Sequence, residues 1–303
     1  MVGKKSFPRV AWAMLRDTVT AFIDDEALSR GASIAFYTVT SIAPVLFIVI
    51  AIAGLAFGRD AARGAIVGQL GGLMGKQSAQ LLQNAIASAS GTSSGIIATL
   101  VGLAILLVTA SGVFGEMQTA LNAIWKTEAT GTTVSRLIRA RIASLGLVAA
   151  LGFLLLVSLA ISALLAGLGF YVNLFLPFGA QLLELINFAI SFAMISVLFA
   201  AIYKVLPDRD LEWHDVSVGA VATALLFTIG KYLIGLYVGS SMVATTYGAA
   251  GALIVILLWI YYSAQIFLLG AEFTKVYAVY HDSSRIRLPQ AETVSASPDR
   301  SRQ

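Results

Sequence analysis

Six stretches of the chain carry few charged residues and are each long enough to cross a lipid bilayer. A spanning helix needs about 20 mainly apolar residues, because the hydrocarbon core of a bilayer is about 30 Å thick. Transmembrane strands would instead show alternating polarity over segments of about ten residues, and the sequence contains no such pattern. The predicted spans are residues 32–57, 95–116, 140–168, 182–203, 215–237 and 249–271.

The composition supports an all-α integral membrane bundle of six transmembrane helices. Only 12% of the 303 residues are charged and 58% are hydrophobic, whereas a soluble domain carries about 25% charged residues. The chain has no cysteine, so disulfides, thiolate nucleophiles and thiolate metal sites are excluded. Charged residues are spread through the first 30 positions, which predicts no signal peptide there.

The distribution of Lys and Arg predicts the orientation of the bundle. If both termini lie on one side, that side holds sixteen of these residues and the other side holds Arg59, Arg63 and Lys76, while Lys231 lies within a span. Positive residues accumulate on the cytoplasmic side, so both termini are expected in the cytoplasm. The same distribution explains the pI near 9.3 by topology and attraction to anionic lipid. Membrane lipids, and not nucleic acid, are the expected partners.

The membrane domain is expected to cover residues 31–280, with non-spanning parts on either side of it and between its spans. Residues 1–30 are expected to form a cytoplasmic segment with an interfacial helix over 8–24, whose apolar face holds Trp12, Leu15, Val19, Phe22 and Ile23. The first outside loop, 58–94, is expected to hold two short amphipathic helices separated by glycines. The polar residues 281–303 are expected to form a disordered cytoplasmic tail.

Polar residues within the predicted spans are the candidate contacts of a substrate, because such residues are costly in hydrocarbon. On the sixth span, Tyr261, Gln265 and Glu272 fall on one helical face. Gln265 lies closest to the bilayer midplane and Glu272 lies at the inner edge. A polar line inside the bundle would suit the passage of an amphiphilic molecule. The candidate set is Gln265, Lys231, Glu116, Glu272, Glu184, Tyr261 and Thr109.

Each of these residues also has a structural explanation. Glu116 and Glu272 could be boundary residues paired with a loop arginine such as Arg30 or Arg139. Lys231 could extend its ammonium group to the outer headgroups. Gln265 could make a hydrogen bond between helices.

Proline and small residues indicate where helices bend or approach closely. Pro44 cannot donate to the carbonyl of Thr40, so a kink is expected there, either static or acting as a hinge. Small residues four positions apart, such as Gly235 with Gly239, permit close contacts between helices.

Catalytic signatures are absent from the sequence. It contains no metalloprotease, nucleophile-elbow, phosphate-loop or dinucleotide-binding motif. Its carboxylates and two histidines are spread over different loops and depths, whereas a metal-dependent hydrolase needs them clustered. The sequence therefore predicts a protein that is not an enzyme, with no cofactor and no metal.

Several stretches resemble the YihY/BrkB family of bacterial inner-membrane proteins. They are "LSRGASIAFYTVTSIAPVLF", "ALNAIWK", "GKYLIGLYV" and "YGAAGALIVILLWIYYSAQIFLLGAEFTKVY", and the resemblance covers about residues 20–280. It implies a six-helix protein of the inner membrane. Family members have been linked to serum resistance and to transport of lipids or lipopolysaccharide precursors, and they carry the legacy label ribonuclease BN, which is regarded as a misassignment.

Two function classes follow. The first is a transporter, or a flippase-like facilitator, of a lipid or envelope-precursor substrate. The second is a membrane scaffold that binds partners and transports nothing. Ribonuclease activity is not expected, because no catalytic grouping supports it.

Overall fold

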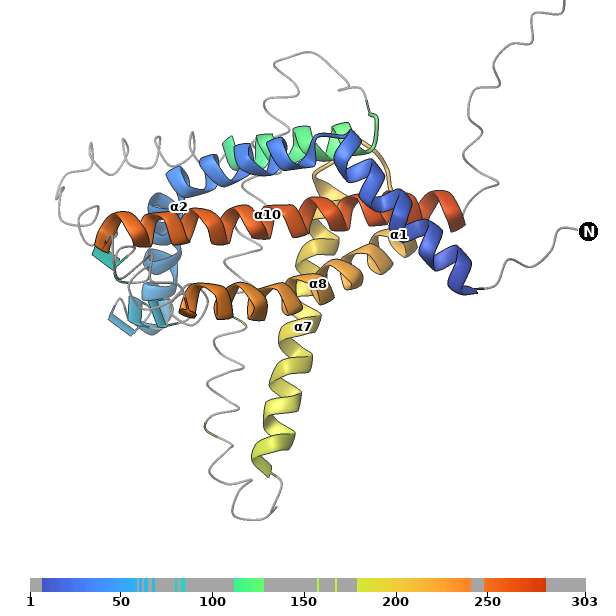
Figure 1. The fold of residues 1–303 in the computed structure, drawn as a ribbon. Helices are drawn as coiled ribbons and strands as arrows, with labels where there is room; N and C mark the ends of the chain where they lie inside the picture. Colours follow the sequence, from blue (N-terminus) through green and yellow to red (C-terminus); the bar gives the residue numbers. More distant parts are fainter. Residues whose placement is uncertain are drawn as a thin grey trace, which may run out of the picture.

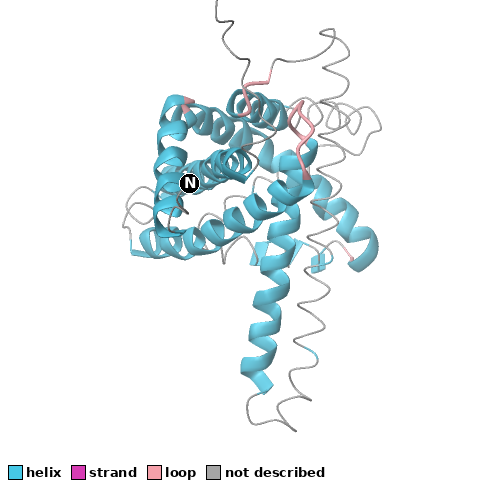
Figure 2. Ribbon diagram, turned by 90° about the vertical axis from the view of Figure 1, so that its right-hand side faces the viewer, coloured by secondary structure: helices cyan, strands magenta, loops and turns pink. Residues whose placement is uncertain are grey.

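The computed structural model describes residues 7–58, 112–127, 179–240 and 248–281, with single positions or pairs between 60 and 84 and at 157 and 167. All regular secondary structure in these residues is helical (Figure 2). The helices are α1 (Phe7–Asp24), α2 (Ala27–Phe57), α7 (Gly179–Val205), α8 (Trp213–Ser240) and α10 (Gly248–His281), together with the helical segment 112–124.

Three of these helices are long and apolar enough to cross a membrane, namely Gln181–Val205 in α7, Trp213–Leu236 in α8 and Leu253–His281 in α10. They correspond to the last three predicted spans. Only the described residues bear on this point, so the total of six spans stays a prediction. Most of the predicted spans 95–116 and 140–168 lies outside the described residues, as does most of the loop 58–94 with its two predicted short helices.

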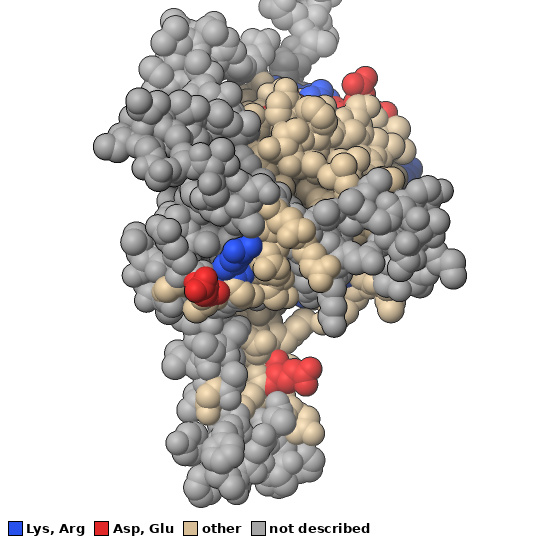
Figure 3. Space-filling model, turned by 90° about the vertical axis from the view of Figure 1, so that its left-hand side faces the viewer, with Lys and Arg blue, Asp and Glu red and all other residues tan. Residues whose placement is uncertain are grey.

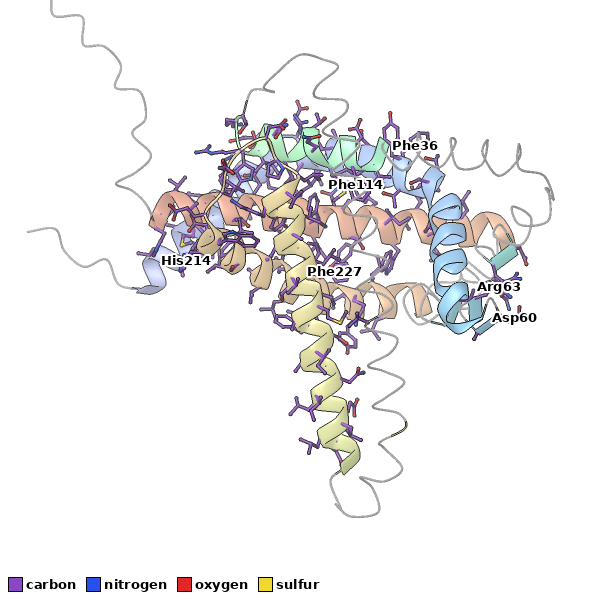
Figure 4. All side chains as sticks on the ribbon, turned by 180° about the vertical axis from the view of Figure 1, so that it is seen from behind. Phe36, Asp60, Arg63, Phe114, His214 and Phe227 are labelled. Carbon is purple, nitrogen blue, oxygen red and sulfur yellow. The ribbon has the colours of Figure 1, made fainter. Side chains whose placement is uncertain are left out.

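Helix α10 is the central element, and α2 and α8 pack along it while α1 crosses its C-terminal end (Figure 1). The segment 112–124 lies beside the first part of α2 (Figure 1). Helix α7 begins away from the bundle, and its later part contacts α8 (Figure 1). His214 lies at one end of this bundle, and Asp60 and Arg63 lie at the opposite end (Figure 4). The described elements therefore surround α10 most completely near its C-terminal end.

Helix α2 runs without interruption through Pro44, and its ribbon bends sharply (Figure 1). A proline inside a helix removes one backbone hydrogen bond, and a bend is the usual result. The hydroxyl groups of Thr38, Thr40 and Ser41 donate to carbonyl oxygens one turn earlier in the same helix. The role of Pro44 as a hinge stays a prediction.

The core lies where α7, α8 and α10 meet. Tyr203 of α7 is fully buried there, and its hydroxyl group donates to the carbonyl oxygen of Phe267 at 2.7 Å and lies 3.1 Å from Thr223 Oγ1. The Tyr203 ring stacks against Phe267 and against Phe199. A buried tyrosine needs a partner for its hydroxyl group, and here one tyrosine joins three helices.

Gly219 and Gly270 allow α8 and α10 to approach closely. A Cβ atom at Gly219 would lie 2.6 Å from Thr274 Cβ, and one at Gly270 would lie 2.7 Å from the Tyr203 hydroxyl oxygen. A Cβ atom at Gly235, by contrast, would meet none of the described residues within 4 Å. The close contact expected at Gly235 with Gly239 stays a prediction, because the described residues cover only part of the surroundings of α8.

Large apolar side chains cover much of the outer surface. On α8 they recur every three or four residues at Val221, Leu225, Ile229, Leu233 and Leu236. The face shown in Figure 3 carries only a few scattered charges among its described residues. A surface of this kind is costly in water and favourable against lipid.

On α1, Trp12, Leu15, Val19 and Ile23 are exposed, while Phe22 packs against the core. The opposite side of the helix is tied to α10, because the Tyr280 hydroxyl group donates to Asp17 at 2.6 Å. The placement of the exposed face against the inner membrane surface stays a prediction.

Candidate functional site

Four charged side chains meet at the C-terminal part of α10. The ammonium group of Lys275 lies 3.1 Å from Asp25 Oδ2 and 3.2 Å from Glu272 Oε2. Lys126, which follows the helical segment 112–124, forms an ion pair with Asp25 Oδ1. We call Asp25, Lys126, Glu272 and Lys275 the inner charge cluster. It joins three parts of the chain that are distant in sequence.

The backbone on both sides of the cluster adopts an uncommon conformation. Glu26 and Lys126 have φ angles of 55° and 49°, in the left-handed region that favours glycine. Lys126 ends its helix in a Schellman arrangement, with Thr127 N–H donating to Asn122 O and Lys126 N–H donating to Ala123 O. Strain of this kind persists where surrounding contacts hold it in place, and the ion pair between Lys126 and Asp25 is such a contact.

The two acids of the cluster are withdrawn from the surface. The side chain of Asp25 is 6% exposed, and that of Glu272 is 0% exposed. Glu272 Oε1 is buried and has no hydrogen-bond partner in the described part of the chain. A buried carboxyl oxygen without a partner is costly, so Glu272 has an unmet capacity to bind.

Burial alone would raise the pKa of Asp25, but hydrogen bonds from Lys126, Glu272 and Lys275 hold it below the ordinary value of 3.8. Asp25 is thus a charged carboxylate that accepts hydrogen bonds from the ammonium groups of Lys126 and Lys275. Arg30 adds a further contact, since its Nε donates to the Asp25 carbonyl oxygen at 2.9 Å.

Acid is expected to destabilise the protein through Asp25. Because the pKa in the folded protein lies below 3.8, the contribution of Asp25 is fully present above that pH and is lost as the pH falls through the folded value. Thermal unfolding of the detergent-purified protein across this range measures the loss. Asp25→Asn should have a lower unfolding temperature than the wild type at neutral pH, and its unfolding temperature should fall less steeply in acid. An equally steep fall in the variant would show that Asp25 is not the group responsible.

Gln265 lies two helical turns before Glu272, or about 10 Å along α10. Its amide nitrogen approaches the carbonyl oxygen of Leu28 at a long 3.4 Å, and its Oε1 is buried without a partner in the described residues. Gly31 leaves room for this side chain, because a Cβ atom there would lie 2.9 Å from Gln265 Cδ. Gln265 and Glu272 therefore both face the beginning of α2 and the turn before it.

A second polar contact holds the helical segment 112–124 against the loop after α7. Asn122 Nδ2 donates to Asp208 Oδ2 at 2.8 Å, and Asp208 N–H donates to Asn122 Oδ1 at 2.8 Å. Arg209 lies over the ring of Trp125, 5.6 Å from its centroid. This contact fixes the end of the segment from which Lys126 reaches Asp25.

Replacing Asn122 with alanine is expected to lower the free energy of unfolding by about 1–3 kcal/mol. Among the described side chains Asp208 would keep only the longer bond from Gln118, at 3.3 Å, and its N–H would lose its acceptor. Thr119→Ala is the matched control, since Thr119 is exposed and bonds only within its own helix turn. Denaturant unfolding in mixed micelles measures both variants. Equal stability of the two would show that the contact with Asp208 contributes nothing.

The other predicted site residues do not join the inner charge cluster. Lys231 lies on α8 over the ring of Tyr232, 5.3 Å from its centroid, and Glu184 is exposed on the projecting part of α7. Tyr261 packs against a small apolar cluster of Ala35, Ile256 and Ile260. Glu116 is half-buried on the segment 112–124. Thr109 lies outside the described residues.

Sequence reasoning missed Asp25, Lys126 and Lys275 as members of a site. Lys126 and Lys275 were counted only as cytoplasmic charges that set topology, and Asp25 was not considered. The expected partner of Glu272 was a loop arginine, whereas the structure pairs it with Lys275. The signal available in the sequence was the position of Lys275, three residues after Glu272 on the same helical face. Asp25 gave no such signal, because it meets Lys275 across a separation of 250 residues.

The described residues hold no group of three or more His, Asp or Glu side chains that could bind a metal ion. His214 and His281 stack with ring centroids 5.0 Å apart. The chemistry available at the inner charge cluster is ion pairing, hydrogen bonding and proton exchange.

The comparisons with known proteins identify one family. A family model described as Virulence factor BrkB matches residues 18–294. A UPF0761 membrane protein of Pasteurella multocida is 30% identical over 198 residues, which cover 65% of this chain and 60% of the relative. A UPF0761 membrane protein of Rhodospirillum centenum is 26% identical over 270 residues, which cover 87% of this chain and 57% of the relative.

A third relative, from Kangiella koreensis, is 28% identical over 171 residues, which cover 56% of this chain and 40% of the relative. The chain thus spans 40% to 60% of the length of these three relatives. No solved structure matches the chain. The family model covers most of the residues, and these relatives are all named as membrane proteins. The chain therefore belongs to the YihY/BrkB family of membrane proteins.

Proposed function

We propose that this protein lies in the bacterial inner membrane with both termini in the cytoplasm, and that it moves, or helps to move, an amphiphilic lipid or envelope precursor between the two leaflets. The observation that carries the proposal is on α10. Gln265 and Glu272 each hold a buried oxygen without a partner in the described residues. Polar groups within an apolar helix are costly unless hydrogen-bond partners satisfy them. The polar headgroup of a passing substrate would supply the missing donors.

The arrangement around these residues supports an amphiphilic substrate. The two polar side chains face α2, and the bundle carries apolar side chains on its outer surface. A substrate with a polar head and acyl chains could place its head along α10 while its chains stay in lipid. Gly31 packs over Gln265, so a headgroup reaches Gln265 only when α2 moves away from α10.

A lipid-movement assay in reconstituted vesicles tests the proposal. Labelled lipids should cross the bilayer faster with the protein than without it, and Gln265→Leu should abolish the gain because it removes the amide that faces α2. Gln181→Leu is the matched control, since Gln181 is exposed at the beginning of α7. Equal rates with and without protein, in both directions and under a proton gradient, would overturn the proposal.

A scaffold function is the second candidate, and the close packing of α8 on α10 through Gly219 and Gly270 favours it. A scaffold needs a rigid bundle and no opening between α2 and α10. It predicts that Gln265→Leu and Glu272→Gln change stability or assembly but leave lipid movement at the rate of empty vesicles. The same assay therefore separates the two candidates.

A further inference from the structure

Lys275 brings two buried carboxyl groups together, because its ammonium group lies 3.1 Å from Asp25 Oδ2 and 3.2 Å from Glu272 Oε2. A carboxylate only accepts hydrogen bonds, so a bond between two carboxyl groups requires a proton on one of them. The two groups cannot both be charged without facing each other as like charges. A proton held by one of them would let the two carboxyl groups share a hydrogen bond and would remove this repulsion.

The surrounding charges place this proton on Glu272. Asp25 accepts from Lys126 and from Lys275, and two ammonium groups favour its charged form. Within the described part of the chain, Glu272 contacts Lys275 as its one cation, is fully buried, and keeps one oxygen without a partner. The third cation nearby is Arg30 of α2, and it binds the Asp25 carbonyl oxygen, not a carboxyl group.

The position of Glu272 links this proton to the contact between α2 and α10. Asp25 lies in the turn between α1 and α2, and Glu272 lies on α10. Two turns earlier on α10, Gln265 is covered by Gly31 of the same α2. A force that separates Asp25 from Glu272 therefore acts on the helix that covers Gln265.

We propose that Glu272 is a proton-binding site whose release of the proton loosens α2 from α10, so that proton movement drives the transport proposed above. The inference rests on that proposed function. In the release step the O–H bond of the Glu272 carboxyl group breaks, the electron pair stays on oxygen, and the proton passes to water on the cytoplasmic side. Two adjacent carboxylates remain, and their repulsion replaces the hydrogen bond that held the turn to α10. Proton rebinding restores that bond.

The proton site can be tested without measuring transport. Infrared difference spectra of the protein in vesicles, recorded between neutral and alkaline pH, detect a protonated carboxyl group by its C=O band. The wild type should show a band that is lost in alkali, Glu272→Gln should lack it, and Glu184→Gln should keep it. Glu184 is the matched control because it is exposed on α7, away from the cluster. A band that persists in Glu272→Gln, or is absent from the wild type, would overturn the inference.

Glu272→Gln preserves the volume of the side chain and can still donate to Asp25, so it imitates the protonated form and should fold. If it cannot be recovered, Glu272→Asp serves instead, because it keeps the acid and should shift the pH at which the band is lost. An unshifted band in that variant would count against Glu272 as its source.

Lipid movement then tests the coupling. A proton gradient should accelerate movement by the wild type, and Glu272→Gln should move lipid at one rate with and without the gradient. A variant that still responds to the gradient would overturn the coupling. If the wild type moves no lipid at all, the proposed function fails, and the infrared result still decides whether Glu272 binds a proton.

Discussion

Replacing Lys275 with methionine is expected to lower the free energy of unfolding by about 3–5 kcal/mol, the cost of removing one partner from a buried ion pair. Lys275 is the only cation that contacts both acids among the described residues, at 3.1 Å from Asp25 and 3.2 Å from Glu272. Methionine keeps the apolar stem and removes only the charge. Asp25 would retain Lys126, but that lysine is 67% exposed, so water screens its charge more strongly.

Lys231→Met is the matched control, because Lys231 lies on α8 and its described contact is the neighbouring Tyr232 ring. It should change stability by less than about 1 kcal/mol. Unfolding of both variants in mixed micelles, followed by circular dichroism, gives the comparison. If Lys275→Met is as stable as Lys231→Met, the inner charge cluster does not hold the helices together.

Replacing Gly270 with alanine is expected to destabilise the contact between α8 and α10 by about 1–3 kcal/mol or more, the usual cost of overpacking a tight contact. The added Cβ atom would lie 2.7 Å from Thr223 Cγ2 and 2.7 Å from the Tyr203 hydroxyl oxygen. Neither neighbour can move freely. Thr223 Oγ1 donates to the carbonyl oxygen of Gly219 at 2.7 Å, and the Tyr203 hydroxyl group is fixed on Phe267.

Gly115→Ala is the control for Gly270→Ala. A Cβ atom at Gly115 meets no described residue within 4 Å, and alanine favours helix over glycine by about 1 kcal/mol, so this variant should be neutral or more stable. Thr223→Ala in the Gly270→Ala background should restore part of the lost stability, since it removes the nearest clashing atoms. A Gly270→Ala protein with the thermal stability of wild type would show that the helices separate at no cost.

The two substitutions probe different parts of one arrangement. Gly270 sets how closely α8 and α10 approach, and Lys275, one helical turn and a half further on, neutralises the acids between α10 and the turn before α2. Rigid packing on one side of α10 and a charge-dependent contact on the other side would let α2 move while α8 stays in place. The proposed transport requires this combination of a movable α2 and a fixed α8.

The sequence by itself determined the fold class, because the free energy of a helix in hydrocarbon depends on the composition of that helix and on its length. The apolar runs at 182–203, 215–237 and 249–271 correspond to α7, α8 and α10, and α10 extends ten residues beyond the predicted end, to His281. That extension carries Glu272 and Lys275. The predicted span ends at residue 271 because the next residue, Glu272, is charged. In the fold this charged side chain is buried and contacts Lys275, so the helix continues past it.

Only the tertiary structure decided which polar residues meet. Gln265 and Glu272 share a face by helical periodicity, which the sequence predicts, but their neighbours at Gly31 and Asp25 depend on how α2 docks on α10. In the same way, the spacing of small residues does not indicate Gly219 and Gly270, where α8 and α10 approach closely. Periodicity is a local property of one helix. The partner of a buried charge is set by the packing of helices that are distant in sequence, and that packing brings Asp25 to Lys275 across 250 residues.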